Sequence, residues 1–405
     1  MKCRHCEKEL NYTFLDLGFA PPSNSYLSKA DLTKPEKYYP LRVKVCDECW
    51  LVQTEDYAKA DELFDSKYAY FSSTSASWLD HAALYSLKII DRLKLSSESL
   101  VVEVASNDGY LLKNFLLAGI PCLGVEPTAS TADASAKLGV NVIREFFSED
   151  LAKTLQHKSK ADLIIGNNVY AHVPDLNDFT RGLKVLLKDD GVITLEFPHL
   201  MQLLKNTQFD TIYHEHFSYL SLYTVNRIFK KFGLRVFDVE QLPTHGGSLR
   251  IYGCHDHSAR ENHSAVSDLL KQEFNYGLQS LNIYEDFQSK VDLIKNNLLE
   301  FLIKQKKAGK SVAAYGAAAK GNTLLNYAGI KLDLIDYVCD AAAAKQEHFM
   351  PGSHIPIKHP SYLEENKVDF ILILPWNISS EIKKQLSFLD STSKFVVSVP
   401  DIKIL

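Results

Sequence analysis

The chain has 405 residues, of which 46% are hydrophobic and 23% are charged, and its formal net charge is −5. These proportions are typical of a globular protein and exclude a disordered or fibrous chain, and the acidic balance disfavours nucleic acid as a partner. At roughly 150 residues per domain, the length predicts two or three domains. The sequence has no secretory signal core at its N-terminus and no apolar run that could span a bilayer, so we expect a cytoplasmic protein without a membrane partner.

Four of the seven cysteines form two Cys-x-x-Cys pairs near the N-terminus. Each pair can direct two thiolates at one ion, so two pairs complete a tetrahedral zinc site. Residues 7–45 separate the pairs, a longer gap than the roughly 15–20 residues usual in zinc ribbons, and an elaborated loop must fill it. We predict one structural zinc ion, with redox-active or unpaired thiols as the alternative, and we expect His5 to be solvated. The predicted ligands are Cys3, Cys6, Cys46 and Cys49.

From about residue 80, short apolar runs alternate with segments of helical periodicity. The first helical segment carries Leu84, Leu87, Ile90 and Leu93. This alternation predicts a parallel sheet with helices on both faces, and ligands bind such sheets at the carboxyl ends of the strands. The expected strands cover residues 100–104, 122–126, 141–143, 162–165 and 192–197, and the expected helices cover about 110–117, 132–138 and 176–187.

The loop after the first of these strands indicates the type of ligand. Residues 103–109 read EVASNDG and contain one glycine, whereas the dinucleotide motif G-x-G-x-x-G contains three. Glu126 ends the next strand, where a carboxylate can accept hydrogen bonds from both hydroxyls of a ribose. This arrangement favours S-adenosylmethionine, and a nucleotide fold that binds NAD is the alternative.

A dense acid–base cluster, Tyr213-His214-Glu215-His216, follows the fifth strand. Imidazole, carboxylate and phenol groups are the side chains that general acid–base catalysis uses. In an extended segment His214 and His216 would share one face, whereas a turn would let Tyr213, Glu215 and His216 converge. A metal site and a solvated polar loop are the alternatives. His172 follows the fourth strand and is expected to face the same crevice, although a structural role for it is equally plausible.

A further strand–loop–helix unit follows a charged helical stretch at residues 264–307. A short apolar strand at 312–315 leads into small residues and Lys320, and a helix is expected from Thr323. The backbone N–H groups and the dipole at a helix N-terminus favour an anion, and the spacing differs from that of a Walker loop. Docking or dimerisation is the alternative role of this unit. Its further expected strands cover residues 335–339, 370–374 and 395–399.

The stretch 244–250 reads THGGSLR and lies between these two units. Its glycines supply flexible backbone, and a guanidinium suits contact with a phosphate. An ordinary hairpin is the alternative interpretation of this stretch.

The order of these motifs along nearly the whole chain resembles the sugar C-methyltransferases, and the combination is more specific than any single motif. One departure is Ala105, where the family usually has glycine, so its methyl group narrows the turn slightly. The motifs that carry the resemblance are the two Cys-x-x-Cys pairs with Asp16-Leu-Gly and Pro22-x-Asn24 between them, Tyr68-x-Tyr70-Phe71-Ser72 in the position of the cofactor lid, Glu103-x-x-x-Asn107-Asp108-Gly109, Asn168-Val-x-x-His172-Val-x-Asp175, Tyr213-His-Glu-His216, Gly246-Gly-Ser-x-Arg250 and Gly316-Ala-x-Ala-Lys320-Gly-Asn322.

The resemblance implies an α/β protein of three domains. These would be a zinc-binding domain at residues 1–75, a central class I S-adenosylmethionine methyltransferase domain of Rossmann-like fold at 76–260, and a C-terminal Rossmann-like domain at 261–405 that binds the sugar nucleotide. The implied substrate is a nucleotide-linked 4-keto-6-deoxysugar, most often carried by thymidine diphosphate and methylated at C3. We expect the chain to act as a monomer.

The resemblance also implies a mechanism. A base removes the proton beside the ketone, and the resulting enolate attacks the methyl sulfonium. Transfer to oxygen or nitrogen and a non-catalytic sugar-nucleotide-binding protein are the alternatives. The implied catalytic residues are His216 as the base, with Tyr213, Glu215 and His172 assisting it. The implied cofactor-binding residues are Phe71, Glu103, Ala105, Asn107, Asp108, Glu126 and Asn168. The implied substrate-binding residues are Ser248, Arg250, Tyr315, Lys320 and Asn322.

Overall fold

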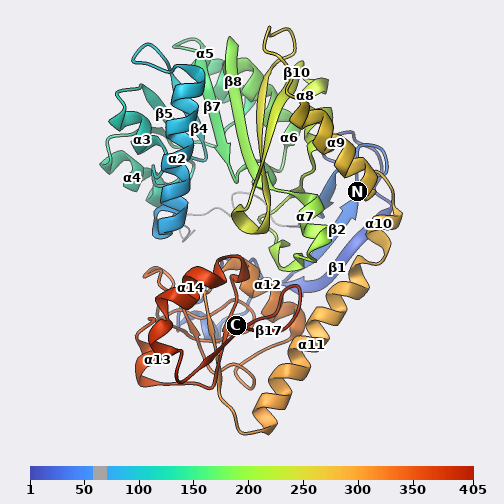
Figure 1. Ribbon diagram of the computed structural model, residues 1–405, viewed down its shortest axis with the longest axis vertical. Helices are drawn as coiled ribbons and strands as arrows, with labels where there is room; N and C mark the ends of the chain where they lie inside the picture. The colour runs from blue at the N-terminus through green and yellow to red at the C-terminus, as the bar shows by residue number, and fades with distance from the viewer. Residues whose placement is uncertain (58–70) are drawn as a thin grey trace.

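The computed structural model describes residues 1–57 and 71–405. Within these ranges the strands form sheets of four, seven and six strands. Figure 1 shows the seven-stranded sheet and its helices above the six-stranded sheet, with strands β1 and β2 along one side between them. The α/β class predicted from the sequence is confirmed.

The four-stranded sheet is antiparallel and has the order β1-β2-β3-β9. Alternating apolar residues of β2, Leu41, Val43 and Val45, are buried, as expected for strands with one face on a core. Its fourth strand, β9, comes from the middle of the chain and directly follows the acid–base cluster. The strands are β1 (Tyr12–Ala20), β2 (Tyr39–Val45), β3 (Val52–Thr54) and β9 (Ser218–Tyr219).

The seven-stranded sheet has the order β10-β11-β8-β7-β4-β5-β6. Its five strands from β8 to β6 are parallel, and β10 and β11 complete it as an antiparallel hairpin. The expected strands are confirmed within a few residues. The seven strands are β4 (Val101–Val104), β5 (Cys122–Val125), β6 (Asn141–Ile143), β7 (Ala161–Asn167), β8 (Leu187–Pro198), β10 (Leu234–Leu242) and β11 (Ser248–His255), of which β10 and β11 were not among the expected strands.

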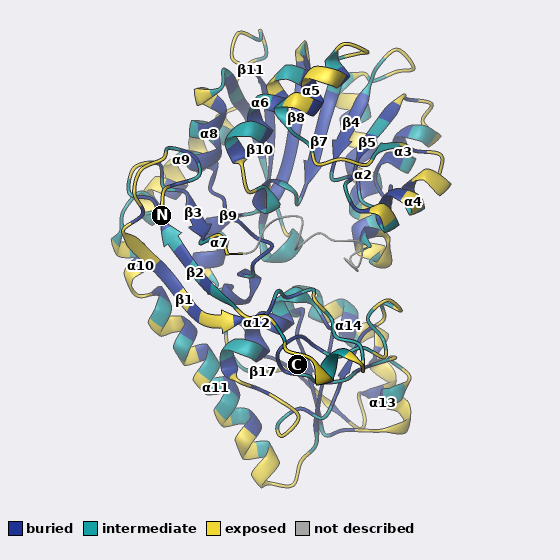
Figure 2. Ribbon diagram, turned by 180° about the vertical axis from the view of Figure 1, so that it is seen from behind, coloured by how far each residue is buried: buried dark blue, intermediate teal, exposed yellow. Residues whose placement is uncertain are grey.

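Helices cover both faces of this sheet, and Figure 2 shows the strands between them as buried. Helices α3, α4 and α6 match expected helices and α2 covers the first expected helical segment, whereas α5, α7 and α8 were not predicted. The helices are α2 (Ala76–Leu93), α3 (Leu112–Leu117), α4 (Ala129–Lys137), α5 (Glu149–Gln156), α6 (Leu176–Leu186), α7 (Leu200–Lys205) and α8 (Leu222–Lys231).

Helix α2 packs on the sheet through a different face from the leucine positions noted in the sequence. Its buried face includes Trp78, Tyr85 and Ile89. Leu84 and Leu87 point outward and are 60% and 68% exposed. The buried stripe of α2 at helical spacing therefore starts at Trp78.

The connections of the central sheet create a crevice between two neighbouring strands. The chain leaves β4 toward β5 on one side and later returns to β7 on the other side of β4. Loops that leave adjacent parallel strands in opposite directions open a ligand-binding crevice at the carboxyl edge of the sheet. The loop at residues 105–109 and Asn168 lie at this edge, after β4 and β7 respectively.

The six-stranded sheet has the order β14-β13-β12-β15-β16-β17, with β17 antiparallel to the rest. The helix expected from Thr323 begins earlier, at Ala319, so Lys320 lies in its first turn. The strands are β12 (Val312–Tyr315), β13 (Val338–Cys339), β14 (Ile357–Lys358), β15 (Phe370–Ile373), β16 (Lys394–Val397) and β17 (Lys403–Ile404). The helices are α12 (Ala319–Ala328), α13 (Tyr362–Glu365) and α14 (Ser379–Gln385).

Helices α9 (Ser264–Tyr276), α10 (Asn282–Glu285) and α11 (Phe287–Lys307) join the two large sheets. Figure 1 shows α11 running from the four-stranded sheet down along the C-terminal domain. The Phe14 and Phe287 rings pack 4.6 Å apart, and Gln288 accepts a hydrogen bond from the Asp16 backbone at 2.9 Å. The N-terminal sheet is therefore packed against the C-terminal part of the chain. Among the described residues, no helix is long and apolar enough to cross a membrane.

Candidate active site

The four paired cysteines converge as a metal site requires. Their sulfur atoms all lie within 4.8 Å of one another, and the Cys3–Cys49 and Cys6–Cys46 pairs are each 3.5 Å apart. A disulfide needs about 2.05 Å, whereas zinc bound tetrahedrally at about 2.3 Å puts its sulfurs roughly 3.8 Å apart. Gln53 Nε2 donates to Cys3 Sγ at 3.2 Å, the kind of outer contact that orients metal ligands. The residues present fit zinc.

His5 does not lie in solvent as expected. Its side chain is buried, and its Nδ1 lies 2.9 Å from Asn177 Oδ1 at the start of α6. Burial lowers the pKa of His5, so the ring is neutral near pH 7. His5 therefore joins the zinc domain to the central domain, and it lies outside the metal-binding group.

The loop after β4 has an unusual backbone. Ala105, Asn107 and Gly109 have φ values of 55°, 49° and 78°, the left-handed region that favours glycine and asparagine. The Glu126 carboxylate supports this loop by accepting hydrogen bonds from the Asn107 and Thr128 backbone N–H groups, each at 2.9 Å. Glu126 therefore lies at the end of β5, and each of its carboxylate oxygens already accepts one backbone hydrogen bond.

The loop also binds the segment that precedes α2. Asn107 Oδ1 accepts a hydrogen bond from the Ser72 N–H at 2.9 Å, and Asp108 Oδ2 accepts one from the Ser73 N–H at 3.0 Å. Phe71 directly precedes this turn and is partly buried. Tyr68 and Tyr70 of the proposed lid lie outside the described residues. The described end of the lid segment is therefore anchored on the loop.

Several buried polar atoms at this edge, all but one of them acceptors, have no partner among the described residues, and they test the fit of a cofactor. These atoms are Glu103 Oε2, Asp108 Oδ1, Asn168 Oδ1 and both polar atoms of the Asn167 side chain. Burial, together with Asp108 and Glu126, raises the pKa of Glu103. S-adenosylmethionine brings an ammonium group, ribose hydroxyls and an adenine amine, which are the donors that such acceptors lack. The residues present therefore fit this cofactor.

The acid–base cluster forms a turn, and its hydrogen bonds fix the form of His216. Nδ1 lies 2.8 Å from the Thr211 carbonyl oxygen, which can only accept, so Nδ1 carries the proton. Nε2 is then an acceptor, and it lies 2.8 Å from the Tyr213 hydroxyl. Burial and the neighbouring His172 hold the pKa of His216 well below its usual value. His216 is therefore a neutral ring with its lone pair directed at Tyr213.

His172 and Glu215 complete the cluster. The His172 and His216 rings are 4.5 Å apart, and His172 Nδ1 donates to the Glu215 carbonyl at 2.7 Å. Burial lowers the pKa of His172 to about 4. Glu215 Oε1 accepts hydrogen bonds from the backbone and side chain of Asn24, and burial raises the pKa of Glu215. His214 instead turns toward Pro40, whose carbonyl lies 3.3 Å from its Nε2.

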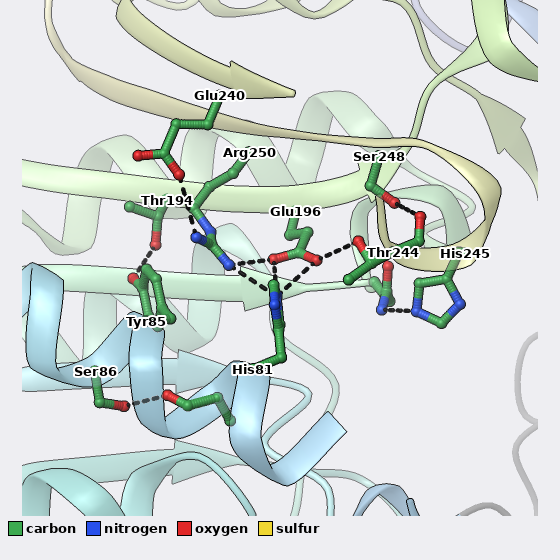
Figure 3. Close-up of polar contacts among 12 residues, drawn as sticks. His81, Tyr85, Ser86, Thr194, Glu196, Glu240, Thr244, His245, Ser248 and Arg250 are labelled. Atoms are coloured by element: carbon green, nitrogen blue, oxygen red, sulfur yellow. Dashed lines mark hydrogen bonds and ion pairs between the residues drawn. The ribbon is translucent and has the colours of Figure 1, made fainter. Parts of the chain in front are cut away.

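Arg250 lies in a polar network between the central sheet and α2, as Figure 3 shows. Its guanidinium donates to Glu196 at 2.5 Å and contacts Glu240 at 3.4 Å. Glu196 also accepts hydrogen bonds from His81 at 2.9 Å and from Thr244 at 3.0 Å. Burial alone would raise the pKa of Glu196, but His81 and Arg250 outweigh it and lower that pKa. The guanidinium therefore already binds two carboxylates of this chain.

Two more of the predicted substrate-binding side chains are also occupied by contacts within the chain. Ser248 Oγ donates to the Thr244 carbonyl at 2.9 Å. Asn322 Nδ2 donates to the Ser23 carbonyl at 2.6 Å, which joins α12 to the N-terminal loop, while Asn322 Oδ1 is buried without a partner among the described residues. Tyr315 is buried at the end of β12, and burial raises its pKa to about 12.

Lys320 lies across the domain boundary from the acid–base cluster. Its Nζ donates to Asn377 Oδ1 at 2.7 Å and lies 4.7 Å from the centre of the Trp376 ring. Burial lowers the pKa of Lys320, and the nearby Asp210 carboxylate partly offsets this effect. The first turn of α12 around it has no side-chain cap, so its backbone N–H groups are available to an anion.

Sequence reasoning missed the residues that join the two domains. Asp210 is fully buried, accepts a hydrogen bond from Trp376 Nε1 at 2.7 Å, and has its pKa raised by burial to about 6. Within the central domain, His245 contacts Asn168 Nδ2 at 2.9 Å and packs against the Trp78 ring, and sequence reasoning did not assign this residue either. The sequence contained one signal of such buried polar contacts. Glu196 is a carboxylate within the apolar run 192–197, and a buried carboxylate needs polar partners.

Comparisons with known families cover the chain in three consecutive parts. A proposed zinc binding domain matches residues 3–64, a methyltransferase domain matches residues 78–239, and the C-methyltransferase C-terminal domain matches residues 243–400. The C-methyltransferase NovU of Streptomyces niveus is 32% identical over all of this chain and 96% of its own length. This chain belongs to the C-methyltransferases. The enzyme is therefore an S-adenosylmethionine-dependent methyltransferase with a four-cysteine zinc site, as the sequence predicted.

Solved structures that resemble this C-methyltransferase match less than half of it. An S-adenosylmethionine-dependent methyltransferase from Clostridium acetobutylicum is 12% identical, with a TM-score of 0.36, and the match covers 44% of this chain and 92% of the other. The magnesium protoporphyrin IX methyltransferase of Synechocystis is 15% identical, with a TM-score of 0.34, and covers 44% and 82%. Neither likeness bears on the substrate of this enzyme.

Proposed function

We propose that the enzyme methylates C3 of a nucleotide-linked 4-keto-6-deoxysugar, with thymidine diphosphate as the carrier. The observation that carries the proposal is the neutral His216, hydrogen-bonded to Tyr213 and situated opposite Lys320 across the domain boundary. A base and an anion-binding group on facing domains suit a substrate with an acidic C–H bond at one end and a diphosphate at the other.

His216 is the proposed base. A ring carbon beside a ketone loses its proton readily because the negative charge spreads onto the ketone oxygen. The lone pair at Nε2 takes this proton, either directly or through the Tyr213 hydroxyl to which it is bonded. The Thr211 carbonyl stabilises the resulting imidazolium through the Nδ1 proton. When bound, S-adenosylmethionine supplies the electrophilic methyl group, and the enolate carbon attacks it.

The other residues of the cluster have positioning roles in this proposal. Tyr213 can donate to the oxygen that becomes negative, the contribution that oxyanion-stabilising groups make. Glu215 has a buried Oε2 without a partner among the described residues, which suits a substrate hydroxyl. His172 packs against His216 and holds its ring from the opposite side. Asn168, Asp108 and Glu126 at the sheet edge would hold the cofactor.

The diphosphate is proposed to lie at the N-terminus of α12. Lys320 supplies the charge there, and the uncapped backbone N–H groups supply donors. Tyr315 and Asn322, at the end of β12 and in the first turns of α12, would shape this site. Ser248 and Arg250 would act through the network around Glu196, because that network occupies their polar groups.

The same proposal covers the state and location of the enzyme. We expect the enzyme to act as a monomer. The seven cysteines all lie in the described residues and form no disulfide, which supports the cytoplasm as the location.

Proton exchange tests the proposal without methyl transfer. With S-adenosylhomocysteine bound and in deuterated water, the enzyme should exchange deuterium at the carbon beside the ketone of a thymidine diphosphate-linked 4-keto-6-deoxysugar. Transfer to oxygen or nitrogen requires no such exchange, so a methylated product formed without exchange would contradict the proposal. A panel of keto-sugar nucleotides, with the product carbon assigned by NMR, identifies the sugar and the position.

Two variants separate the roles of the domains. His216→Gln should lower kcat by about 10²–10⁴-fold, the usual contribution of a general base, and should abolish the exchange while cofactor affinity is unchanged. Lys320→Ala should raise the KM for the sugar nucleotide and leave cofactor affinity unchanged, because a phosphate contact acts in the ground and transition states alike. Loss of cofactor binding in Lys320→Ala would place Lys320 elsewhere than at the diphosphate.

A further inference from the structure

A small cavity lies beside His216, on the side of the ring that faces α7. Its volume is about 10 Å³, and its lining includes His199, Thr211, His216, Ser218 and Tyr219. A buried water molecule needs roughly 10–15 Å³ of such space and two to four polar partners. The cavity is therefore of a size for one water molecule and too small for a substrate or cofactor group.

Three of the lining residues carry a buried polar atom without a hydrogen-bond partner in the described part of the chain. These atoms are His199 Nδ1, Ser218 Oγ and Tyr219 Oη. The three residues are 1%, 0% and 5% exposed, so bulk solvent does not reach them. Native proteins leave few buried polar groups unpaired, and three such atoms around one cavity indicate a shared ligand.

The neighbours of His199 determine which polar role its Nδ1 can have. His199 Nε2 lies 2.7 Å from Glu273 Oε1, and the same carboxylate accepts hydrogen bonds from the Leu222 and Tyr223 backbone N–H groups. Because a carboxylate accepts, Nε2 carries the proton of a neutral His199 and Nδ1 is an acceptor. A water molecule can donate one hydrogen to Nδ1 and accept hydrogens from the two hydroxyls.

We propose that one water molecule is held permanently by His199, Ser218 and Tyr219 and forms part of the acid–base centre. Ser218 and Tyr219 form β9, which directly follows the turn that carries His216, whereas His199 precedes α7 and is joined to α9 through Glu273. The water adds a side-chain contact between these two parts, which the Leu200 N–H and the Leu220 carbonyl already join at 2.9 Å. It positions His216 through Tyr219, whose ring centre lies 6.1 Å from that of His216.

The sign of a stability change distinguishes a hydrated cavity from a dry one. If water occupies the cavity, Tyr219→Phe removes a hydrogen bond, and the thermal midpoint should fall by about 2 °C or more. If the cavity is dry, the same change removes an unpaired buried hydroxyl, so the midpoint should rise, and this result would overturn the proposal. Tyr170→Phe is the matched control, because the Tyr170 hydroxyl is bonded to Thr180 at 2.7 Å and its loss should be destabilising.

A crystal structure of the full chain that shows ordered solvent provides the direct test. Electron density for one water within hydrogen-bond distance of all three atoms is expected in the wild type and should be absent in the Ser218→Ala/Tyr219→Phe double variant. A wild-type cavity without density would refute the proposal even if the variants were destabilised.

The positioning role rests on the proposed function and has a readout of its own. The double variant should lower kcat several-fold and leave cofactor affinity and the KM for the sugar nucleotide unchanged. An unchanged kcat, with the density and the stability change as expected, would overturn the positioning role while the water site stands. Failure of the proposed function itself would appear separately, as an absence of deuterium exchange in the wild type.

Discussion

Ala105 occupies a backbone conformation that its side chain disfavours. Its φ of 55° brings the Cβ close to the following carbonyl, at a cost of roughly 1–2 kcal/mol for an L-residue. The usual glycine of the family at this position avoids that cost. The sequence showed that Ala105 departs from the family pattern, but the left-handed φ that explains the pattern required the structure.

We therefore expect Ala105→Gly to stabilise the protein by about 0.5–1 kcal/mol, because relief of the strain exceeds the entropic cost of glycine. Denaturant unfolding without cofactor measures the change. Ala313→Gly is the control, because Ala313 is buried in β12 and the same substitution there should be destabilising. A destabilised Ala105→Gly variant would show that the turn carries no such strain.

At the level of single residues, the sequence placed many groups correctly but could not tell which of their polar atoms were already occupied. The sequence left an extended segment and a turn open for Tyr213 and His216, and the structure has the turn that brings them together. Arg250 could not be assigned in this way, because its partner Glu196 is more than fifty positions away and on a different strand. Asp210 and Trp376 meet only because two domains pack together.

Strand β3 connects the four-cysteine zinc site to the segment that carries the proposed base, His216. The Cys46–Cys49 turn leads directly into this strand, which pairs with β9. At its end, the Thr54 N–H donates to the Phe217 carbonyl at 3.1 Å, and Thr54 Oγ1 donates to the His216 carbonyl at 3.2 Å. The zinc site is thus connected by one short strand to the backbone of the proposed base.

Loss of zinc should therefore impair catalysis as well as stability. We expect Cys46→Ser to release zinc and to lower kcat at least about 10-fold in the protein that remains folded, since displacement of a catalytic group by 1 Å can cost about 100-fold. Cofactor affinity should be unchanged, because the loop at residues 105–109 belongs to another sheet. Elemental analysis, calorimetry and kinetics measure the three quantities, and Cys122→Ala is the control outside the zinc site. A full kcat in zinc-free enzyme would contradict this coupling.

Secondary structure was easiest to predict where the pattern was strong. The buried strands of the central sheet were recognisable from their apolar runs. Helix α5 was missed because it is only eight residues long and largely polar. Helix α12 begins four residues before the expected position because its first turn consists of small residues and Lys320, which resemble a loop in sequence. Strand β9 has two residues and exists only through its pairing with β3.

For the molecule as a whole, buried histidines make stability depend on pH. Burial lowers the pKa of both His172 and His245 to about 4. Below pH 6.5 the unfolded chain binds protons at these groups and the folded chain does not, so each histidine destabilises the protein as the pH falls from about 6.5 to about 4. Asp210, whose pKa burial raises to about 6, acts in the opposite direction below pH 6.

A substitution isolates the contribution of one histidine. Relative to His245→Asn, the wild type should lose stability as the pH falls from 6.5 to 4, with a slope of up to about 1.4 kcal/mol per pH unit. Asparagine suits the left-handed φ of 55° at this position. Unfolding free energies measured across this pH range give the slope, and the exposed His157→Asn is the control. Parallel pH profiles for the wild type and His245→Asn would disprove the shift.

Strand β9 is synthesised long after its partner β3, and this delay affects the folding of the N-terminal sheet during translation. At about 5–20 residues per second, the roughly 160 residues between β3 and β9 take roughly 8–30 s to synthesise. During that time the cysteines can bind metal, while β3 presents an unpaired edge that invites pairing with other chains. We therefore expect a chain truncated before residue 218 to bind metal but to be prone to aggregation, because β3 lacks its partner β9.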